Sequence, residues 1–353
     1  MMTTSELAKQ LGISRGTISR VINNHPNVKE ETRQRVQEAL KEYSYTPNET
    51  ARSLVMKKKF RLAVIVFSEP AFFWKQVECG VTTAHNELKS QGVAVDYFVT
   101  NILNPTEQIN LIKRLPNEGY DGIAIAPNNP NLLSEEIEKL SDRGFPIVII
   151  NSEIPSVNQL CYIGCDYTQS GALAAELFSK VLTDSCQIVI LTLKDSVNAI
   201  EQRITGFRKE LSRHDNMRLK QICRFSRNAE GVYEEVRNLL NTNSDIDGIY
   251  VSFGALEQTA QALLDSKYQK KPIIVGYDLN DSIYDYLKSG AITATICHEP
   301  FNQGYFAIKI LHRYINRGII PSSSLMYNKL EVIFASNAKY YINEHMHLEM
   351  FHE

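Results

Sequence analysis

The sequence predicts an α/β protein with an all-α headpiece at its N-terminus, followed by two doubly wound parallel sheets. The first observation is that apolar residues recur at helical spacing in short segments over residues 3–55. The second is that, from residue 61 onward, short apolar runs alternate with amphipathic segments of helical length. Short strands with intervening helices form βαβ units and parallel sheets. Because this alternation occurs as two sets in series, we expect two such sheets.

Length and charge distribution also indicate separate modules. A chain of 353 residues is too long for one small core, so two or three domains are expected. The formal charge of −2 divides unevenly: residues 1–61 hold 12 Lys or Arg and 6 Glu, giving +6, and the remainder carries −8. Such asymmetry indicates a nucleic-acid-binding module joined to an acidic domain.

The first two predicted helices form a helix-turn-helix. A helix capped near Thr3 ends at Leu11, where Gly12 supplies a tight turn. Ser14 then caps a second helix over residues 15–23. One face of this helix is apolar and the opposite face is polar; the apolar residues are Ile18, Val21 and Ile22, and the outward ones are Gly16, Arg20 and Asn23, with Arg15 in the first turn. A second helix with an outward arginine is suited to reading the DNA major groove, which predicts binding to double-stranded DNA.

A third helix and a short hinge segment follow. The third helix spans residues 28–43, and its inner stripe is predicted to be Val36, Ala39, Leu40 and Tyr43. Beyond Pro47, Asn48 caps a segment over 49–55 that is well below the ~12–15 residues an isolated helix needs. This segment is therefore expected to become helical only when docked. Lys58 and its two lysine neighbours add positive charge at the exit.

The headpiece resembles a known family. Residues 3–54 are similar to the headpiece of the lactose/galactose repressor (LacI/GalR) family of bacterial transcription regulators, and the resemblance rests on Ser-Arg-Gly-Thr-Ile-Ser-Arg-Val-Ile-Asn at 14–23 and Tyr-Thr-Pro-Asn at 45–48. It implies base reading by Arg15, Gly16 and Arg20. It implies phosphate contacts from Ser14, Thr17, Ser19, Asn23, Thr32 and Tyr45, and Thr3 is counted among the DNA contacts. Gly16 has no side chain, so base reading there falls to the two arginines or to the backbone. Lys29 stands where the family usually caps its third helix with Ser.

The same resemblance assigns a role to the hinge. In the family this segment folds in the minor groove, where a leucine wedges into a central base step. Leu54 is the matching residue, and Ala51 lies one turn earlier on the same face. Inserting an apolar wedge and kinking the duplex is an established minor-groove device. A plain linker with an incidental leucine is the alternative.

The predicted elements of the large domain alternate regularly. In the first set, strands are expected at 62–67, 93–99, 122–125 and 147–150, with helices at 74–91, 105–118 and 132–143. In the second set, helices are expected at 169–182, 199–212, 229–241 and 256–264, with strands at 187–191, 219–222, 248–251 and 273–277. Ligands of such sheets bind in the crevice at the carboxyl ends of the strands.

This part of the chain, about 61–342, is similar to the family's core, which resembles periplasmic sugar-binding proteins of type I. Motifs include Pro-Ala-Phe-Phe-Trp at 70–74, Tyr-Ile-Gly-Cys-Asp at 162–166 and Val-Gly-Tyr-Asp at 275–278. In that architecture the chain crosses between lobes three times, here near Asp166, His298 and Tyr327. The expected domains are a headpiece at 1–47, a hinge at 48–60, a core at 61–343 and a tail at 344–353. Within the core, the N-subdomain is expected at 61–165 and 298–326, and the C-subdomain at 166–297 and 327–343.

The cleft candidates have chemistry suited to a sugar. Planar hydrogen-bonding groups bind sugar hydroxyls and aromatic faces contact C–H surfaces. The resemblance matches Arg203 to a sugar-binding arginine, which donates paired hydrogen bonds, and Asp278 to a hydroxyl-binding aspartate. The predicted ligand-binding residues are Phe73, Trp74, Asn128, Asn151, Asp166, Arg203, Asp278 and His298. Core packing is the alternative for the aromatic pair, and His298 departs from the Gln or Asp frequent in relatives.

Other function classes lack their motifs. The sequence has no phosphate-binding loop, dinucleotide fingerprint, hydrolase nucleophile elbow or zinc-protease motif, so no enzyme activity and no cofactor are expected. Cys161 and Cys165 lack a second pair, so buried thiols are expected and a zinc site is the alternative. No apolar run approaches the ~18 residues of a membrane span, and no targeting segment is visible, so a cytoplasmic protein without membrane contact is expected.

Together these features predict a transcription regulator, usually a repressor. It would bind a palindromic operator as a homodimer and respond to a small carbohydrate-like effector. The alternative keeps DNA binding but makes the core a docking module for a protein partner, without a small-molecule ligand.

Overall fold

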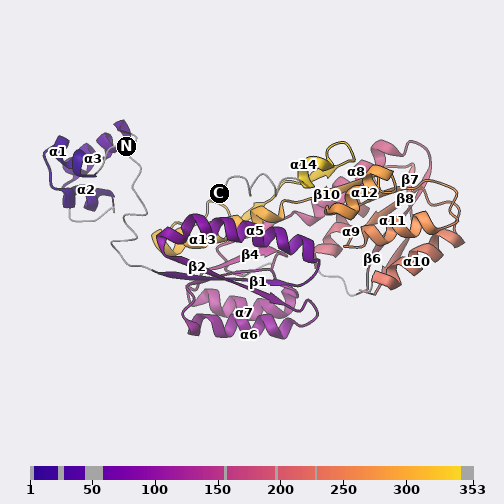
Figure 1. Ribbon diagram of the computed structural model, residues 1–353, viewed down its shortest axis with the longest axis horizontal. Coiled ribbons are helices and arrows are strands. Elements are labelled where there is room, and N and C mark those ends of the chain that lie inside the picture. Colours follow the sequence, from indigo (N-terminus) through magenta and orange to yellow (C-terminus); the bar gives the residue numbers. More distant parts are fainter. Residues whose placement is uncertain are drawn as a thin grey trace. The chain divides into compact units, whose positions relative to one another are not determined.

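The computed structural model describes residues 4–22, 28–43, 59–154, 157–194, 198–226 and 229–342. The chain divides into two compact units, one up to Lys58 and one from Lys59 onward, and each is described by itself (Figure 1). Of the predicted DNA contacts, Thr3, Asn23, Tyr45, Ala51 and Leu54 lie outside the described residues.

The headpiece contains three helices: α1 (Thr4–Leu11), α2 (Arg15–Ile22) and α3 (Glu30–Glu42). Their shared core consists of buried apolar side chains, namely Leu7, Ala8, Ile18, Val21, Val36 and Ala39. Gly12 joins α1 to the turn with φ +65°, a conformation that favours glycine. The Ser14 hydroxyl accepts the backbone N–H of Thr17 at 3.0 Å, so the predicted cap of α2 is confirmed.

One headpiece prediction is wrong. Tyr43 was expected on the inner stripe of the third helix, but α3 ends at Glu42 and the tyrosine ring is 37% exposed. Its hydroxyl accepts a hydrogen bond from Nε2 of Gln10 at 2.6 Å. Because the helix ends before Tyr43, this residue does not continue the helical spacing that would place its ring in the core.

The second unit has two lobes, each built on a six-stranded sheet. The first sheet has the order β11-β5-β4-β3-β1-β2, and all neighbours are parallel. Its strands are β1 (Phe60–Phe67), β2 (Val93–Thr100), β3 (Gly122–Ile125), β4 (Ile147–Asn151), β5 (Cys161–Gly164) and β11 (Leu325–Tyr327). The second sheet has the order β12-β10-β9-β8-β6-β7, in which only β12 runs antiparallel to its neighbour. Its strands are β6 (Cys186–Leu193), β7 (Met217–Phe225), β8 (Gly248–Val251), β9 (Ile273–Tyr277), β10 (Ala294–Cys297) and β12 (Glu331–Ile333).

Helices cover both faces of the first sheet. On one face lie α5 (Ala71–Leu88) and α13 (Pro300–Arg317), and on the other lie α6 (Pro105–Arg114) and α7 (Pro130–Asp142) (Figure 1). The two faces bury separate apolar clusters, one on Val64 and Val66 and the other on Ala63 and Ile65. Alternate residues of β1 therefore face opposite layers, which is why the strand reads as a continuous apolar run.

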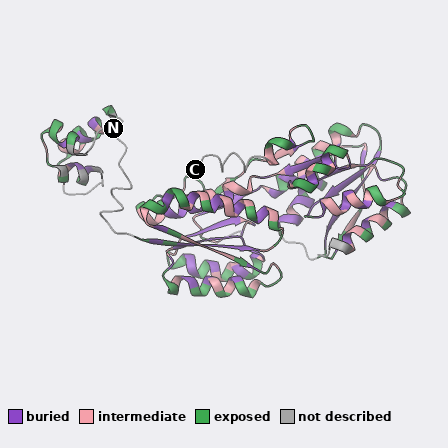
Figure 2. Cartoon of the chain, viewed as in Figure 1, coloured by how far each residue is buried: buried purple, intermediate pink, exposed green. Residues whose placement is uncertain are grey.

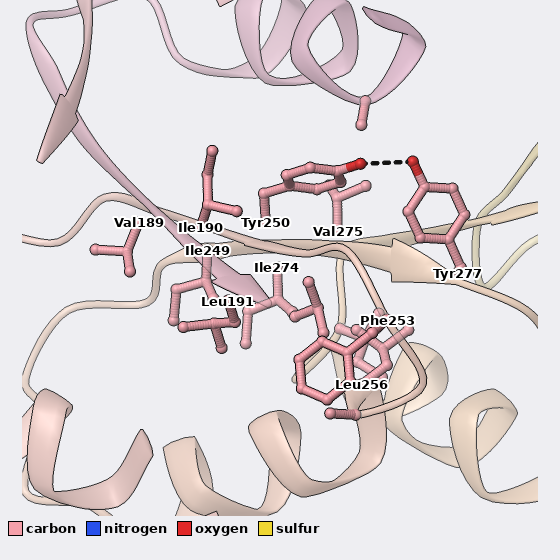
Figure 3. Close-up of a cluster of buried hydrophobic side chains, with 14 of the residues drawn as sticks. Val189, Ile190, Leu191, Ile249, Tyr250, Phe253, Leu256, Ile274, Val275 and Tyr277 are labelled. Carbon is pink, nitrogen blue, oxygen red and sulfur yellow. Dashed lines mark hydrogen bonds between the residues drawn. The ribbon is translucent and has the colours of Figure 1, made fainter. Parts of the chain in front are cut away.

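The helices of the second lobe are α8 (Tyr167–Val181), α9 (Asn198–Leu211), α10 (Ala229–Thr242), α11 (Leu256–Asp265) and α12 (Asp281–Ser289). Two short 3-10 segments (Lys89–Gln91 and Leu115–Glu118) and α14 (Ala338–Ile342) complete the described elements. Buried strands alternate with helices whose outer sides are exposed (Figure 2). Figure 3 shows aliphatic side chains of β6, β8 and β9 on both faces of the second sheet.

The two lobes exchange helices. After β5 the chain leaves the first sheet and α8 packs on α9 in the second lobe; after β10 it returns and α13 packs on α5. The last crossing joins β11 of the first sheet to β12 of the second. The two sheets thus repeat one strand order, and in each set the helix that follows the fifth strand packs in the other lobe.

Both helix crossings depend on glycine. A Cβ atom on Gly171 of α8 would overlap the carbonyl oxygen of Arg203, and one on Gly206 of α9 would overlap that of Thr168. Gly80 of α5 and Gly304 of α13 make the equivalent close approach in the first lobe. Because both partners are backbone, neither can give way. The crossing of α8 and α9 therefore fixes the backbone of Arg203.

Candidate functional site

The headpiece presents a polar face on α2. Gly16 and Arg20 are exposed and Thr17 is half-buried, whereas Ile18 and Val21 on the opposite face are buried. The structure leaves the side chains of Arg15 and Ser19 undescribed. Thr32 is half-buried in the first turn of α3.

Gly16 is not required by packing. Among the described atoms, a Cβ at this position would meet Oγ of Ser14 alone, at an ordinary 3.6 Å. Glycine inside a helix costs up to about 1 kcal/mol relative to alanine. An alanine at this position would therefore favour the helix more than glycine does, and the role of Gly16 in DNA binding stays a prediction.

A cleft of about 850 Å³ opens in the second unit, lined by residues from both lobes. It lies at the carboxyl ends of the strands: Ser68 follows β1, Asn151 ends β4, Phe253 lies two residues beyond β8 and Asp278 follows β9. Open parallel sheets bind ligands at this edge. Six predicted residues line the cleft, namely Phe73, Trp74, Asn151, Arg203, Asp278 and His298.

Three of them form a contact cluster. Nη2 of Arg203 lies 3.5 Å from Nε2 of His298, and the same imidazole nitrogen lies 3.5 Å from Oδ1 of Asp278. Arg203 also donates from Nη1 to the carbonyl oxygen of Ser252 at 3.2 Å. Its guanidinium carbon lies 3.5 Å from the ring centre of Tyr277, a cation–π contact. Arg203 and His298 are 7% and 3% exposed, so the cluster is largely removed from water.

Burial shifts the protonation of two members. It raises the pKa of Asp278 from 3.8 to about 6, although the nearby Arg203 acts to lower it. Burial, assisted by the positive charge of Arg203, lowers the pKa of His298 to about 3. At neutral pH the imidazole is therefore uncharged, and its contact with Asp278 is not an ion pair. Nε of Arg203 and Nδ1 of His298 are buried and have no hydrogen-bond partner among the described residues.

Asn151 and Asp278 occupy equivalent places in the two lobes. Asn151 ends the fourth strand of the first sheet, and Asp278 directly follows the corresponding strand of the second. Both have positive φ, 63° and 67°, which asparagine and aspartate tolerate better than most residues. The Asp278 backbone is held by its N–H donating to Ile296 at 3.0 Å and its carbonyl accepting from Oγ1 of Thr295 at 2.6 Å. A left-handed backbone is strained for residues other than glycine, and such strained residues cluster at functional sites in proteins.

The predicted aromatic pair serves both the cleft and the core. Phe73 and Trp74 line the cleft, yet they are 4% and 5% exposed and belong to the first lobe's apolar cluster. Trp74 donates from Nε1 to the carbonyl oxygen of Glu69 at 3.1 Å. The Phe73 ring centre lies 5.2 Å from that of His298. The aromatic surface therefore adjoins the polar cluster.

Two predicted ligand residues are directed elsewhere. Asn128 is buried and ties two loops together, donating from Nδ2 to the carbonyl oxygen of Asn101 at 3.1 Å. Asp166 caps α8, its Oδ1 accepting the N–H of Gln169 at 2.9 Å. Neither lines the cleft. Both residues follow strands as expected, but their side chains form hydrogen bonds with nearby backbone groups.

The structure adds cleft residues that sequence patterns did not identify. Tyr167 and Tyr277 flank Arg203, and the Tyr277 hydroxyl is 2.7 Å from that of Tyr250 (Figure 3). The ring of Tyr250 in turn stacks on Phe207, one helical turn after Arg203. Tyr167 and Tyr277 each adjoin a predicted aspartate in sequence, which is the one signal that marks them, whereas Tyr250 has no such neighbour.

Two protein families match the chain. Residues 3–48 match "Bacterial regulatory proteins, lacI family" and residues 62–318 match "Periplasmic binding protein domain". The chain belongs to the periplasmic-binding-protein domain family through its core, and its headpiece carries a lacI-family helix-turn-helix. The headpiece makes it a DNA-binding transcription regulator, and the predicted fold class is confirmed. Among the described residues, no helix is long and apolar enough to cross a membrane.

Relatives of this chain carry regulatory names. Catabolite control protein A of Priestia megaterium is 24% identical over 332 residues, which is 91% of this chain and 95% of that protein. The HTH-type transcriptional regulator pepR1 of Lactobacillus delbrueckii subsp. lactis is 28% identical over 220 residues, 59% of this chain and 60% of that one.

Solved structures similar to the core show the same fold. GanP, a glucose-galactose binding protein from Geobacillus stearothermophilus, has a TM-score of 0.72 at 21% identity, covering 79% of this chain and 99% of that one. A solute binding protein from Burkholderia graminis in complex with D-arabinose has a TM-score of 0.74 at 22% identity, covering 81% and 98%.

Proposed function

We propose that this regulator binds a palindromic operator as a homodimer, acts as a repressor in the cytoplasm, and responds to a small carbohydrate-like effector bound between its lobes. The observation that carries the effector proposal is the cluster of Arg203, Asp278 and His298 at the carboxyl ends of the strands. It faces a cleft to which the other lobe contributes Asn151 and Phe73. The cluster concentrates hydrogen-bonding groups, two of them unpartnered, in a largely buried site.

The chemistry of the cleft suits hydroxyl groups. Asp278 accepts hydrogen bonds, Arg203 donates them, and the neutral His298 has one donor and one acceptor nitrogen. Phe73 and Trp74 supply apolar surface beside these groups. A mostly apolar cleft with a few convergent polar groups is the usual form of a small-molecule site. GanP is a glucose-galactose binding protein and the Burkholderia protein is in complex with D-arabinose, which supports a sugar for this chain.

A ligand in this cleft would contact both lobes. A ligand shifts an equilibrium only by its different affinity for the two states. Contacts to Asn151 in one lobe and Asp278 in the other are made together only when the lobes hold a suitable spacing, so the ligand would favour one arrangement. Three chain crossings join the lobes, and hinge closure around a ligand is a common switching device in such folds.

Dimeric operator binding is proposed from the headpiece. One helix-turn-helix reads a single half-site, and dimers with twofold symmetry read two half-sites one helical turn apart. Selection of bound sequences from random double-stranded DNA by the full chain tests this. The expected result is a palindromic consensus, together with a dimeric mass in sedimentation velocity. A single unrepeated half-site bound by a monomer would contradict it.

The competing function is a core that docks a protein partner instead of a small molecule. Thermal unfolding of the full chain in the presence of neutral sugars, sugar phosphates and amino sugars separates the two. An effector-binding core is expected to unfold at a higher temperature with at least one of them, because a ligand that binds only the native state stabilises it. No shift with any compound would favour the docking module.

A further inference from the structure

We infer that the cleft takes an uncharged carbohydrate and excludes phosphorylated sugars. This inference rests on the proposed function, because it concerns the ligand of the same cleft. It is drawn from the distribution of charge over the lining residues and from the helix N-termini that open onto them.

The lining has one cationic side chain and three carboxylates. Arg203 is the only lysine or arginine among the described residues that line the cleft, whereas Glu69, Glu257 and Asp278 all carry carboxyl groups there. His298 adds no charge, since burial lowers its pKa to about 3. A phosphate ester carries about −1.5 to −2 charge at neutral pH. The described part of the lining is therefore net negative, whereas a phosphorylated ligand would need cations.

The single arginine is already engaged. One face of its guanidinium lies 3.5 Å from the Tyr277 ring centre, and Tyr167 lies 5.0 Å away. Nη1 donates to the carbonyl oxygen of Ser252 at 3.2 Å. The nearby carboxyl group of Asp278 compensates the charge of Arg203. It acts to raise the pKa of Arg203, and Arg203 acts to lower the pKa of Asp278. Two of the five N–H groups of Arg203 are therefore already used within the chain, by the Ser252 carbonyl and the His298 ring, and its unpartnered Nε is buried and can donate to a single hydroxyl oxygen.

Helix N-termini offer the other usual phosphate site, through free N–H groups and the helix dipole. Here several of these helix N-termini have acidic side chains of the chain itself next to them. Glu257, in the first turn of α11, lines the cleft, and Glu69 lies just before α5. The first turns of α9 and α12 hold Glu201 and Asp281. A phosphate at the N-terminus of α11 would therefore meet the Glu257 carboxylate, and one near the start of α5 would meet Glu69, the two acids of this set that line the cleft.

An uncharged polyol meets no such repulsion. The carboxylates accept hydrogen bonds from its hydroxyls, and Asn151 and Gln258 can both donate and accept. Phe72 is half-buried and Leu103 is 75% exposed on the first lobe's side of the cleft, so apolar surface is available for C–H faces. The lining thus favours many weak polar contacts over one strong anion contact.

Matched pairs of ligands test this on the full chain by isothermal titration calorimetry. The probes are D-glucose with its 6-phosphate, D-galactose with its 6-phosphate, cellobiose with its 6′-phosphate and maltose with its 6′-phosphate. We expect at least one uncharged member to bind, with the phosphorylated member binding at least tenfold more weakly. Asp278→Asn is expected to abolish the binding, which places it in the cleft.

A charge-neutralising variant isolates the cause. Glu69→Gln with Glu257→Gln is expected to strengthen binding of the phosphorylated member at least fivefold and to change the uncharged member less than threefold. Glu135→Gln with Glu138→Gln, on the outer face of α7, makes the same change in net charge away from the cleft and should alter neither. A phosphorylated member that binds more tightly than its partner in the wild type overturns the inference and leaves the effector function standing. If no member of any pair binds, the effector function itself fails and the inference with it.

Discussion

Nε2 of His298 lies 3.5 Å from Oδ1 of Asp278, and this contact joins the ligand cleft to the chain crossings between lobes. His298 follows β10, where the chain returns to the first lobe, and its carbonyl oxygen accepts from Nδ2 of Asn328 in the third crossing at 3.1 Å. Its ring centre lies 6.0 Å from that of Tyr167, just past the first crossing. A ligand that contacts Asp278 would therefore also affect His298, which has contacts at all three chain crossings.

Asp278 should make the core less stable at neutral pH than a neutral residue would. Its pKa in the folded protein is about 6 against the usual 3.8, so the folded state holds the proton more tightly than the unfolded chain. The stability associated with protonation is complete below pH 3.8 and is lost as the pH rises through 6. Asp278→Asn should therefore raise the free energy of unfolding at pH 7.5 by up to ~3 kcal/mol and change it little at pH 4.

Urea unfolding of wild type and Asp278→Asn at the two pH values measures this difference. A variant that is less stable than wild type at pH 7.5 would show that the carboxylate stabilises the fold, contrary to the account.

Ligand binding should depend on the same titration of Asp278. Affinity for an uncharged sugar is expected to decrease below pH 6, where the carboxylate that accepts its hydroxyls becomes protonated.

The glycine crossing of α8 and α9 should control the position of Arg203. Gly206→Ala would push a Cβ into the carbonyl oxygen of Thr168, so we expect a loss of ~1–3 kcal/mol of stability and weaker effector binding. Gly254→Ala is the matched control, because Gly254 lines the cleft with no atom within 4 Å of an added Cβ. Equal thermal unfolding temperatures for the two variants would show that the close crossing of α8 and α9 does not stabilise the fold.

Arg20 is expected to read bases. Arg20→Ala should lose roughly 1–3 kcal/mol of discrimination between operator and scrambled DNA, because the exposed guanidinium would no longer pair with a base edge. Lys58→Ala, in the basic linker, should weaken binding to both DNAs alike. Gel-shift titrations on both DNAs measure the ratio. An Arg20→Ala variant with unchanged discrimination would assign this arginine to phosphate.

Gly16→Ala should separate folding from DNA binding in the headpiece. Because the added Cβ meets only Ser14 at 3.6 Å, the variant is expected to unfold at the same or a higher temperature. Helix propensity favours alanine here by up to about 1 kcal/mol. Operator affinity should nevertheless decrease, since the new methyl group stands on the face that approaches the bases. Unchanged affinity with unchanged stability would make Gly16 incidental.

Much of the fold follows from sequence periodicity. The predicted strands at 122–125, 248–251 and 273–277 coincide with β3, β8 and β9, because buried apolar runs bounded by turns have sharp ends. The sequence patterns predict neither β5 nor any element beyond Tyr277. The short strands β11 and β12 hold three residues each and exist through pairing with distant strands, which no local pattern reports. The helix α13 does carry helical spacing, in Ala307, Ile308 and Leu311, and was identifiable.

The site was only partly readable. Asp278 and Asn151 could be placed because strand ends of parallel sheets converge at one edge. Asn128 and Asp166 satisfy the same rule, yet nearby backbone groups bind their side chains. Which strand-end residue faces the cleft depends on local hydrogen bonds formed only in the folded chain. The pairing of Arg203 with Tyr277 similarly needs the close crossing of two helices.

The most direct test of the account is the effector response of the operator complex. With a sugar identified by calorimetry, fluorescence-anisotropy titrations of labelled operator are carried out for wild type and Asp278→Ala across effector concentrations. We expect the effector to change wild-type operator affinity, whereas the variant binds operator nearly as wild type does and shows no response. A variant that responds at wild-type effector concentrations would contradict the assignment of this cleft as the switch.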